Sequence, residues 1–273
     1  MDPLLTALIM GTVQGLTEFL PVSSSAHLII VPYLLGIHDP FLTSLAFSVM
    51  LHVGTLVALL IYFAGDWLRL VPAFLTAVRD RSLSGDPNRR LAMLLAVATV
   101  PAVVAGLLLG DLEDVVRSQI GLVATMLIVG AAILWLAERS GRRTKVALDL
   151  TPANAFWIGV AQAVALVPGI SRSGISISAG LLSGLRREEA ARFSFLMATP
   201  VTAGAATLEV IQVVRGGAVG VEVGPLAIGL AASFVFGILA ISGLLRFLRT
   251  RSTDVFVVYR VLLAAFVLVV WLG

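Results

Sequence analysis

Long apolar segments alternate with short polar ones along this chain, and the apolar segments have the length that a bilayer requires. A transmembrane helix needs about 20 consecutive, mainly apolar residues. Six segments meet this requirement: 42–63, 91–110, 119–137, 190–213, 224–246 and 254–272. The pattern therefore predicts six helices that each cross a membrane.

Two further apolar regions are interrupted near their centres. Region 3–36 is broken at Pro21, region 153–185 is broken at Pro168 and Gly169, and serines follow each break. Proline ends a helix, and each remaining piece is shorter than the roughly 20 residues of a crossing. We therefore predict two re-entrant helical hairpins, each of which enters and leaves on one side of the membrane.

The positive charges predict the orientation. Most of the 19 Lys and Arg residues lie in four segments: 64–90, 138–152, 186–192 and 246–253. Cytoplasmic loops carry an excess of Lys and Arg, so these four segments are expected on the cytoplasmic side. The loop 111–118 holds Asp111, Glu113 and Asp114 and is expected on the outer side. Six crossings agree with this assignment only if both broken regions are hairpins.

The two halves of the chain then insert in opposite senses, and they share weak sequence similarity. Four residues of the first half match four of the second at a constant offset of 148: Gly11, Gln14, Ser23 and Ser25 match Gly159, Gln162, Ser171 and Ser173. We predict an all-α integral membrane protein, a single domain over 1–273. It contains inverted repeats at about 1–140 and 150–273, each a re-entrant hairpin plus three transmembrane helices.

Composition agrees with a membrane protein and excludes several functions. The chain is 59% hydrophobic and 13% charged, with a mean hydropathy of +1.02, which excludes a soluble globular domain. It has no cysteine, so disulfides and thiolate-bound metals are excluded. The basic residues lie between spans, where they set orientation, and we expect no nucleic-acid partner. No Lys or Arg precedes the first apolar segment, which we expect to be retained.

Polar residues gather at both breaks. Gln14 and Glu18 are four residues apart and share one helix face, while Ser23 or Ser24 is placed to cap the next helix, with His27 in its first turn. Free backbone amides and the helix dipole make such a helix start an anion site. Ser24 and His27 are candidate nucleophiles, and Glu18 is a candidate base.

The second break repeats this arrangement with a cation. Ser171 is the expected cap, and Arg172 supplies a permanent charge with a fork suited to phosphate oxygens. Ionisable groups at membrane depth are expensive, so Arg172 is read as functional, with Glu18 as its structural partner. The two breaks together predict a pocket for a phosphorylated group.

Other polar residues receive structural interpretations. His52 and Glu209 are isolated within spans and are expected to make packing or inter-helix polar contacts. Arg260 is expected to extend to the cytoplasmic surface, and 64–90 is expected to be a solvated connector.

The two polar motifs resemble those of a known family. The residues Gln14-Gly-Leu-Thr-Glu18-Phe-Leu-Pro-Val-Ser-Ser24 with His27, and Pro168-Gly-Ile-Ser-Arg172-Ser-Gly174, are similar to the signatures of the undecaprenyl-diphosphate phosphatases, or bacitracin-resistance proteins. The resemblance implies hydrolysis of undecaprenyl diphosphate to the monophosphate and phosphate, which recycles the lipid carrier of the cell wall. It also implies a multi-pass protein of the bacterial plasma membrane, with its site facing outward and assisted by a divalent cation, Mg or Ca.

The resemblance also implies roles for individual residues. The matching catalytic positions are Glu18, Ser24, His27 and Arg172. The matching substrate-binding positions are Gln14, Ser23, Ser25, Gly169, Ser171 and Ser173. Glu18 is also the candidate metal ligand, although Gln14 stands where many members have a second glutamate.

Some alternatives stay open at this point. The residues leave the nucleophile as Ser24 or His27. Inverted repeats with broken helices are also typical of transporters, so a polyprenyl-phosphate flippase with the same anion site is the rival function. The expected partners are a polyprenyl diphosphate lipid and the bilayer. A homodimer is possible, and the sequence leaves the oligomeric state open.

Overall fold

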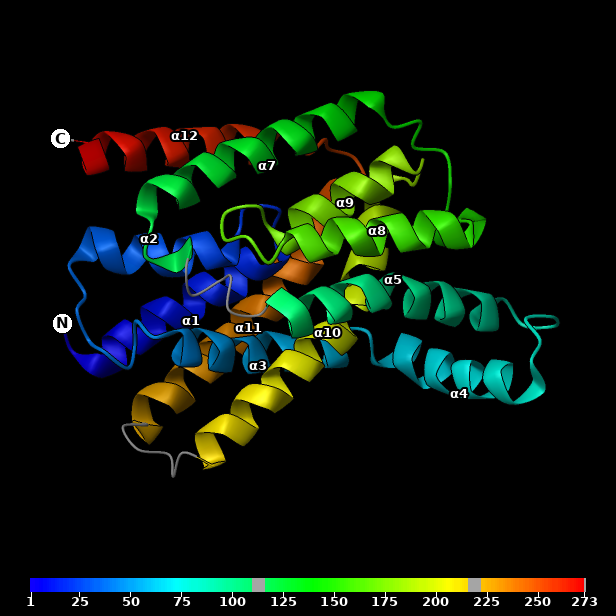
Figure 1. The fold of residues 1–273 in the computed structure, drawn as a ribbon, viewed down its shortest axis with the longest axis horizontal. Coiled ribbons are helices and arrows are strands. Elements are labelled where there is room, and N and C mark those ends of the chain that lie inside the picture. The colour runs from blue at the N-terminus through cyan, green and yellow to red at the C-terminus, as the bar shows by residue number, and fades with distance from the viewer. Residues whose placement is uncertain (110–115, 216–221, 273) are drawn as a thin grey trace.

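The computed structural model describes residues 1–109, 116–215 and 222–272, and the chain there is built of helices (Figure 1). The helices are α1 (Pro3–Phe19), α2 (Ser24–Leu35), α3 (Leu45–Tyr62), α4 (Ala64–Asp80), α5 (Pro87–Leu109), α7 (Ile120–Ser140), α8 (Pro152–Val164), α9 (Arg172–Leu182), α10 (Arg187–Arg215), α11 (Val223–Leu248) and α12 (Asp254–Leu272). The all-α prediction is confirmed for these residues. The outer-loop residues Asp111, Glu113 and Asp114 lie outside them.

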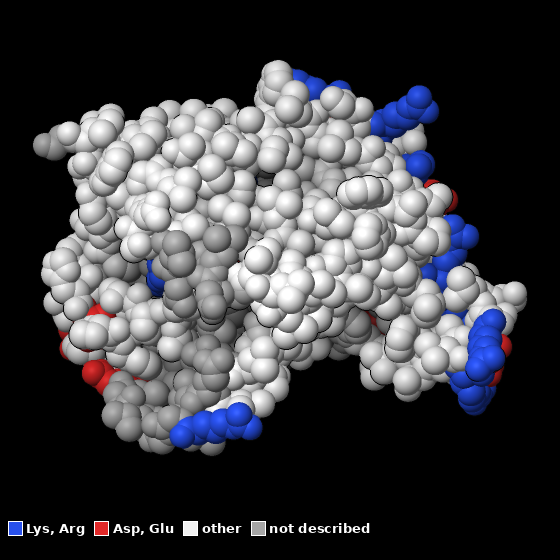
Figure 2. Space-filling view, viewed as in Figure 1, with Lys and Arg blue, Asp and Glu red and all other residues white. Residues whose placement is uncertain are grey.

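Five of the described helices are long and apolar enough to cross a membrane: α3, α5, α7, α11 and α12. The sixth predicted span, 190–213, lies within the 29-residue helix α10. Large apolar side chains face outward, as at Leu108, which is 76% exposed, and the surface in Figure 2 is largely uncharged. A soluble monomer does not expose this much apolar surface. The chain is therefore a multi-pass helical membrane protein.

Both broken regions consist of two helices joined at the predicted break. Ser23 caps α2 and Ser171 caps α9, and both have positive φ angles, 75° and 77°. Each serine Oγ accepts a hydrogen bond from the backbone N–H three residues later, from Ala26 at 3.4 Å and from Gly174 at 3.1 Å. The same local geometry therefore starts both second helices.

Small residues let the first helix of each pair lie close to another helix. A Cβ added to Gly11 on α1 would lie 2.2 Å from the carbonyl oxygen of Gly229 on α11. A Cβ added to Gly159 on α8 would lie 2.1 Å from the carbonyl oxygen of Ala98 on α5. Close backbone approach through glycine is typical of helix packing in membranes. This packing fixes α1 and α8, and with them the two breaks.

The four basic segments gather at one end of the molecule. Asp66 pairs with Arg192 at 2.6 Å, and Glu138 accepts hydrogen bonds from Arg187 and from the hydroxyl of Thr253. These contacts join residues of all four segments. In Figure 2 the Lys and Arg side chains cluster at the end where α4 and α5 connect.

The segment 64–90 is not only a connector, which corrects that prediction. Most of it forms α4, because apolar residues recur at helical spacing and bury one face, at Leu70, Ala73 and Ala77. The opposite face exposes apolar side chains, among them Leu68 at 78% and Leu75 at 61%.

The prediction that Arg260 extends to the membrane surface is wrong. Its side chain is 0% exposed and its nitrogens donate to four backbone carbonyls, of Pro21, Leu127, Gly169 and Ile170, at 2.7–3.4 Å. A chain break inside an apolar bundle leaves carbonyl groups without helical partners, and such groups require donors. Arg260 therefore connects the two breaks to each other and to α7.

Candidate active site

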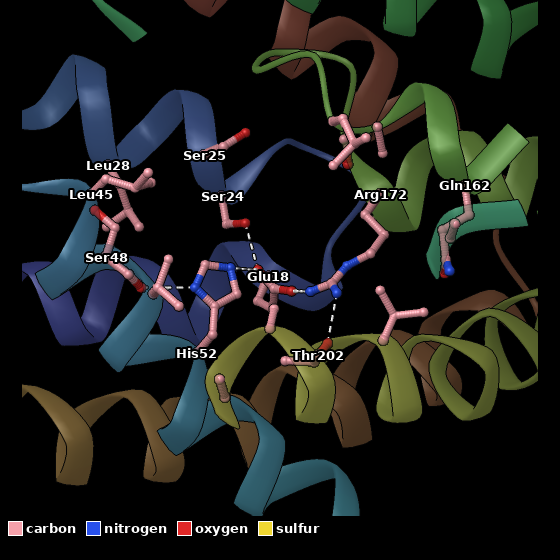
Figure 3. Close-up of a pocket in the computed structure, with 18 of the residues that line it drawn as sticks. Glu18, Ser24, Ser25, Leu28, Leu45, Ser48, His52, Gln162, Arg172 and Thr202 are labelled. Carbon is pink, nitrogen blue, oxygen red and sulfur yellow. Dashed lines mark hydrogen bonds and ion pairs between the residues drawn. The ribbon is translucent and has the colours of Figure 1, made fainter. Parts of the chain in front are cut away.

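A cavity of about 190 Å³ lies where the two breaks approach each other (Figure 3). Its polar lining comes from six helices, from the break before α9 and from the segment before α7: Glu18, Ser24, Ser25, Ser48, His52, Arg117, Gln162, Ser171, Arg172 and Thr202. Apolar residues complete the lining: Leu28, Leu45, Val49, Ala102, Ala163, Ala165, Leu166, Val201, Ala205 and Ala206. A cavity with polar groups set in an apolar wall is the usual form of a ligand site.

Glu18 and Arg172 meet at the centre of this cavity, although they are 154 residues apart. Arg172 Nη2 forms an ion pair with Glu18 Oε1, and Nη1 donates to Thr202 Oγ1 at 2.6 Å. Pairing offsets the cost of placing a charge in an apolar interior. The structure thus brings the two predicted polar motifs together through their charged members.

The other carboxylate oxygen of Glu18 contacts the candidate nucleophile. Glu18 Oε2 accepts a hydrogen bond from Ser24 Oγ at 2.6 Å and another from Gln14 Nε2 at 3.0 Å. A hydroxyl that donates to a carboxylate within this distance is the arrangement of a nucleophile and its base. Ser24 is the first residue of α2, so the amide end of that helix lies beside its hydroxyl.

His52 belongs to the same cluster, and its contact with Glu18 is one of the inter-helix polar contacts that the sequence predicted for it as an alternative to packing. Its Nε2 lies 3.3 Å from Glu18 Oε2, and its Nδ1 donates to the backbone oxygen of Ser48 at 2.8 Å. Figure 3 shows His52 reaching from α3 toward Glu18. The available signal was an ionisable side chain at membrane depth, the same rule that selected Arg172.

His27 is directed elsewhere. Its side chain is buried but does not line the cavity, and its ring stacks on Tyr259 with centroids 5.7 Å apart. Nδ1 donates to the backbone oxygen of Ser23 at 2.7 Å, and Nε2 lies 2.7 Å from the Tyr259 hydroxyl. Both ring nitrogens therefore have protein partners.

The predicted substrate-binding residues fall into two groups. Ser25 and Ser171 line the cavity. The other four are not lining residues: Gln14, Ser23, Gly169 and Ser173. Three of them hydrogen-bond residues that do line it, Gln14 with Glu18, Ser23 with Ser25 and Ser173 with Ser171. Ser173 Oγ donates to the backbone oxygen of Leu20 at 2.9 Å, which connects the second break to the first. These four residues support the lining rather than form it.

The described residues do not fit a divalent cation held by the protein. They contain no group of three or more His, Cys, Asp or Glu side chains close enough to share an ion. Glu18 is the one carboxylate that lines the cavity in the part of the chain the structure describes, and both of its oxygens already have partners. A cationic Arg172 beside it also disfavours a metal ion at that position.

The fold and the site together define a class: a helical membrane protein with an interior cavity lined by a hydroxyl, a carboxylate and a guanidinium. The chain matches the family described as bacitracin resistance protein BacA over residues 7–266, and it belongs to that family.

Curated relatives cover almost the whole chain. An undecaprenyl-diphosphatase of Rubrobacter xylanophilus is 48% identical over 267 residues, which are 97% of each protein. Proteins with the same name from Desulforudis audaxviator and Pelobacter propionicus are 43% and 44% identical. These alignments cover 96% of both proteins in the first case, and 95% of this chain and 94% of the relative in the second.

Proposed function

We propose that this chain is a membrane phosphatase that hydrolyses undecaprenyl diphosphate to undecaprenyl phosphate and inorganic phosphate, and so recycles the cell-wall lipid carrier. The observation that carries the proposal is the contact of Ser24, Glu18 and Arg172 in one cavity. The names of the relatives support the substrate.

Ser24 is the proposed nucleophile, because its hydroxyl lines the cavity while both nitrogens of His27 are engaged behind it. Ser24 Oγ attacks the terminal phosphorus and its proton passes to Glu18 Oε2. A bond forms between Oγ and phosphorus, the bond to the bridging oxygen breaks, and its electron pair leaves with undecaprenyl phosphate.

Water completes the reaction. Its oxygen attacks the phosphorus of phosphoserine and gives one proton to Glu18, while Glu18 returns the first proton to the departing Ser24 oxygen. The products are inorganic phosphate and the original serine, so the proton balance closes.

Arg172 is proposed to stabilise the charge that develops on the phosphoryl oxygens. It holds Glu18 in the free protein and turns its fork toward the substrate phosphate when that group arrives. The amide ends of α2 and α9 add donors on the two sides of the cavity.

For the membrane arrangement we propose that both helical pairs, α1–α2 and α8–α9, are re-entrant hairpins. With six crossings they make one domain over 1–273 in the bacterial plasma membrane, with inverted repeats at about 1–140 and 150–273. The matching caps and the cluster of Lys and Arg at the end where α4 and α5 connect support this arrangement. The basic end is then cytoplasmic, and the active site opens to the outer face.

The test uses the full chain purified in detergent, where no membrane gradient exists. We expect phosphate release from undecaprenyl diphosphate with magnesium or calcium present, and none from a Ser24→Ala variant. Binding of the lipid by the parent protein without any phosphate release would overturn the phosphatase and favour the rival flippase.

A further inference from the structure

Gln162 on α8 is a polar residue of the cavity that no catalytic step above uses. Its side chain lines the cavity and is 3% exposed, yet neither its Nε2 nor its Oε1 has a hydrogen-bond partner among the residues that the structure describes. Buried polar groups are nearly always paired, and leaving one unpaired is destabilising. The unpaired amide therefore lowers the stability of the protein, and the packing of the fold gives no reason for a glutamine at this position.

Gln14, which precedes Gln162 by 148 positions, shows what such an amide does when it is structural. Gln14 stands four residues before Glu18 on α1 and donates to its carboxylate at 3.0 Å. Gln162 stands four residues before Leu166, where no acceptor exists. The second glutamine thus keeps its donors free on the face that enters the cavity.

The surroundings of Gln162 indicate what it binds. Ser171 and Arg172 line the same cavity, and in the view of Figure 3 Gln162 lies on the Arg172 side, away from Glu18. A primary amide offers two N–H donors and no charge. Phosphoryl oxygens accept such donors, and Arg172 already selects for an anion there.

We propose that Gln162 is a substrate-binding residue whose Nε2 donates to the terminal phosphate of a diphosphate lipid, on the side opposite Ser24. This inference rests on the proposed function, because it assigns a contact within the same site. Gln162 holds the phosphate in line for the attack by Ser24, so its effect falls on both binding and turnover.

The experiment compares Gln162→Met and Gln162→Glu with the parent protein. Methionine keeps the volume and removes both polar atoms, whereas glutamate keeps the shape and replaces the donors with a negative charge. We expect kcat/KM for undecaprenyl diphosphate to fall at least tenfold in Gln162→Met and further in Gln162→Glu. The exposed Gln119 is the matched control, and Gln119→Met should keep the parental kcat/KM.

Thermal stability separates a binding role from a structural one. Replacing an unpaired buried amide by an apolar side chain should leave the thermal midpoint of unliganded Gln162→Met equal to or above the parental value. A lower midpoint with parental kinetics would assign Gln162 to the fold and overturn the proposal.

Binding of inorganic pyrophosphate distinguishes this proposal from the proposed function. Pyrophosphate should raise the midpoint of the parent but not of Gln162→Met. Equal stabilisation of both proteins would overturn the assignment of Gln162. If the parent binds pyrophosphate through Gln162 but releases no phosphate from the lipid, the phosphatase fails and the binding site stands.

Discussion

The two helical pairs share one backbone geometry and carry different chemistry. Ser23 and Ser171 start α2 and α9 with φ angles that differ by only a few degrees, and each places a residue at the same first helical position. That residue is the hydroxyl-bearing Ser24 in the first pair and the cationic Arg172 in the second. One backbone arrangement therefore supplies both a nucleophile and a charge to stabilise its product.

The difference extends to the position six residues before Ser24 and the equivalent position before Arg172. The first pair has Glu18 where the second, 148 positions later, has Leu166. An acid in both places would put two carboxylates beside one phosphate, and like charges repel strongly in a poorly solvated interior. The asymmetry gives a base to one side of the phosphate and leaves the other side free of negative charge.

Ser24→Ala should cause the largest loss, because it removes the nucleophile of the first pair. We expect activity to fall about a thousandfold or more, as with other nucleophile deletions, without loss of the fold. Trapping the phosphoenzyme and mapping it by mass spectrometry should find phosphoserine at position 24. His27→Gln is the comparison variant and should retain turnover. A phosphohistidine at position 27 would reverse the two roles.

Arg172→Ala tests the contribution of the second pair. It should cost about 3 kcal/mol of transition-state stabilisation, roughly a hundredfold in kcat, because the phosphoryl charge loses its fork. Arg172→Lys keeps the charge without the paired donors and should fall between parent and Ala. Arg139→Ala removes an exposed arginine and should leave kcat unchanged. A well-folded Arg172→Ala protein with parental kcat would contradict the shared site.

The parts of this site that sequence predicted are those encoded by neighbouring residues. Pro21, Gly169 and the capping serines act on their own backbone, so the breaks and helix starts were readable directly. The pairing of Glu18 with Arg172 was also predictable, since each charge at membrane depth needs a partner and few exist.

The parts that sequence missed depend on contacts between distant segments. His27 looked catalytic because it stands three residues after Ser24, but it faces Tyr259, 232 residues away. Arg260 looked like a surface residue because its helix begins nearby, at Asp254, but its acceptors lie 90 to 239 residues away. Both cases depend on where the side chain points around its own helix and on which other helix it faces. A single sequence gives neither.

Gly169→Ala tests whether the second pair needs a glycine at its break. Gly169 has φ of +100°, and a Cβ there would lie 2.5 Å from the backbone oxygen of Val123. We expect a loss of stability of about 2–3 kcal/mol, read as a lower thermal midpoint, because strain and a backbone clash add. Gly36→Ala is the control, since its φ is +61° with open space around it. It should cost only about 1 kcal/mol. Equal losses of stability in the two variants would contradict the proposed clash at Gly169.

His52→Gln should have the smallest effect. It tests whether His52 on α3 adds to the positive charge that faces Glu18. His52 Nδ1 donates to a carbonyl oxygen and Nε2 lies 3.3 Å from a carboxylate oxygen of Glu18, so a ring protonated on both nitrogens would pair its positive charge with Glu18. Glutamine keeps one donor for Glu18 and removes that charge. We expect kcat to fall by no more than about tenfold, near 1.4 kcal/mol, with little change in thermal midpoint.

His38 is the matched control for this change, since it is exposed in the segment between α2 and α3. His38→Gln should leave kcat at the parental value, whereas His52→Leu should reduce it further than His52→Gln because no donor then faces Glu18. If Gln and Leu at position 52 give the same kcat, the hydrogen bond to Glu18 does not matter to turnover. The positive charge of the cavity would then come from Arg172 and Arg117 without a contribution from α3. The first helical pair would supply the nucleophile and base, and the second pair would supply a charge that acts independently of His52.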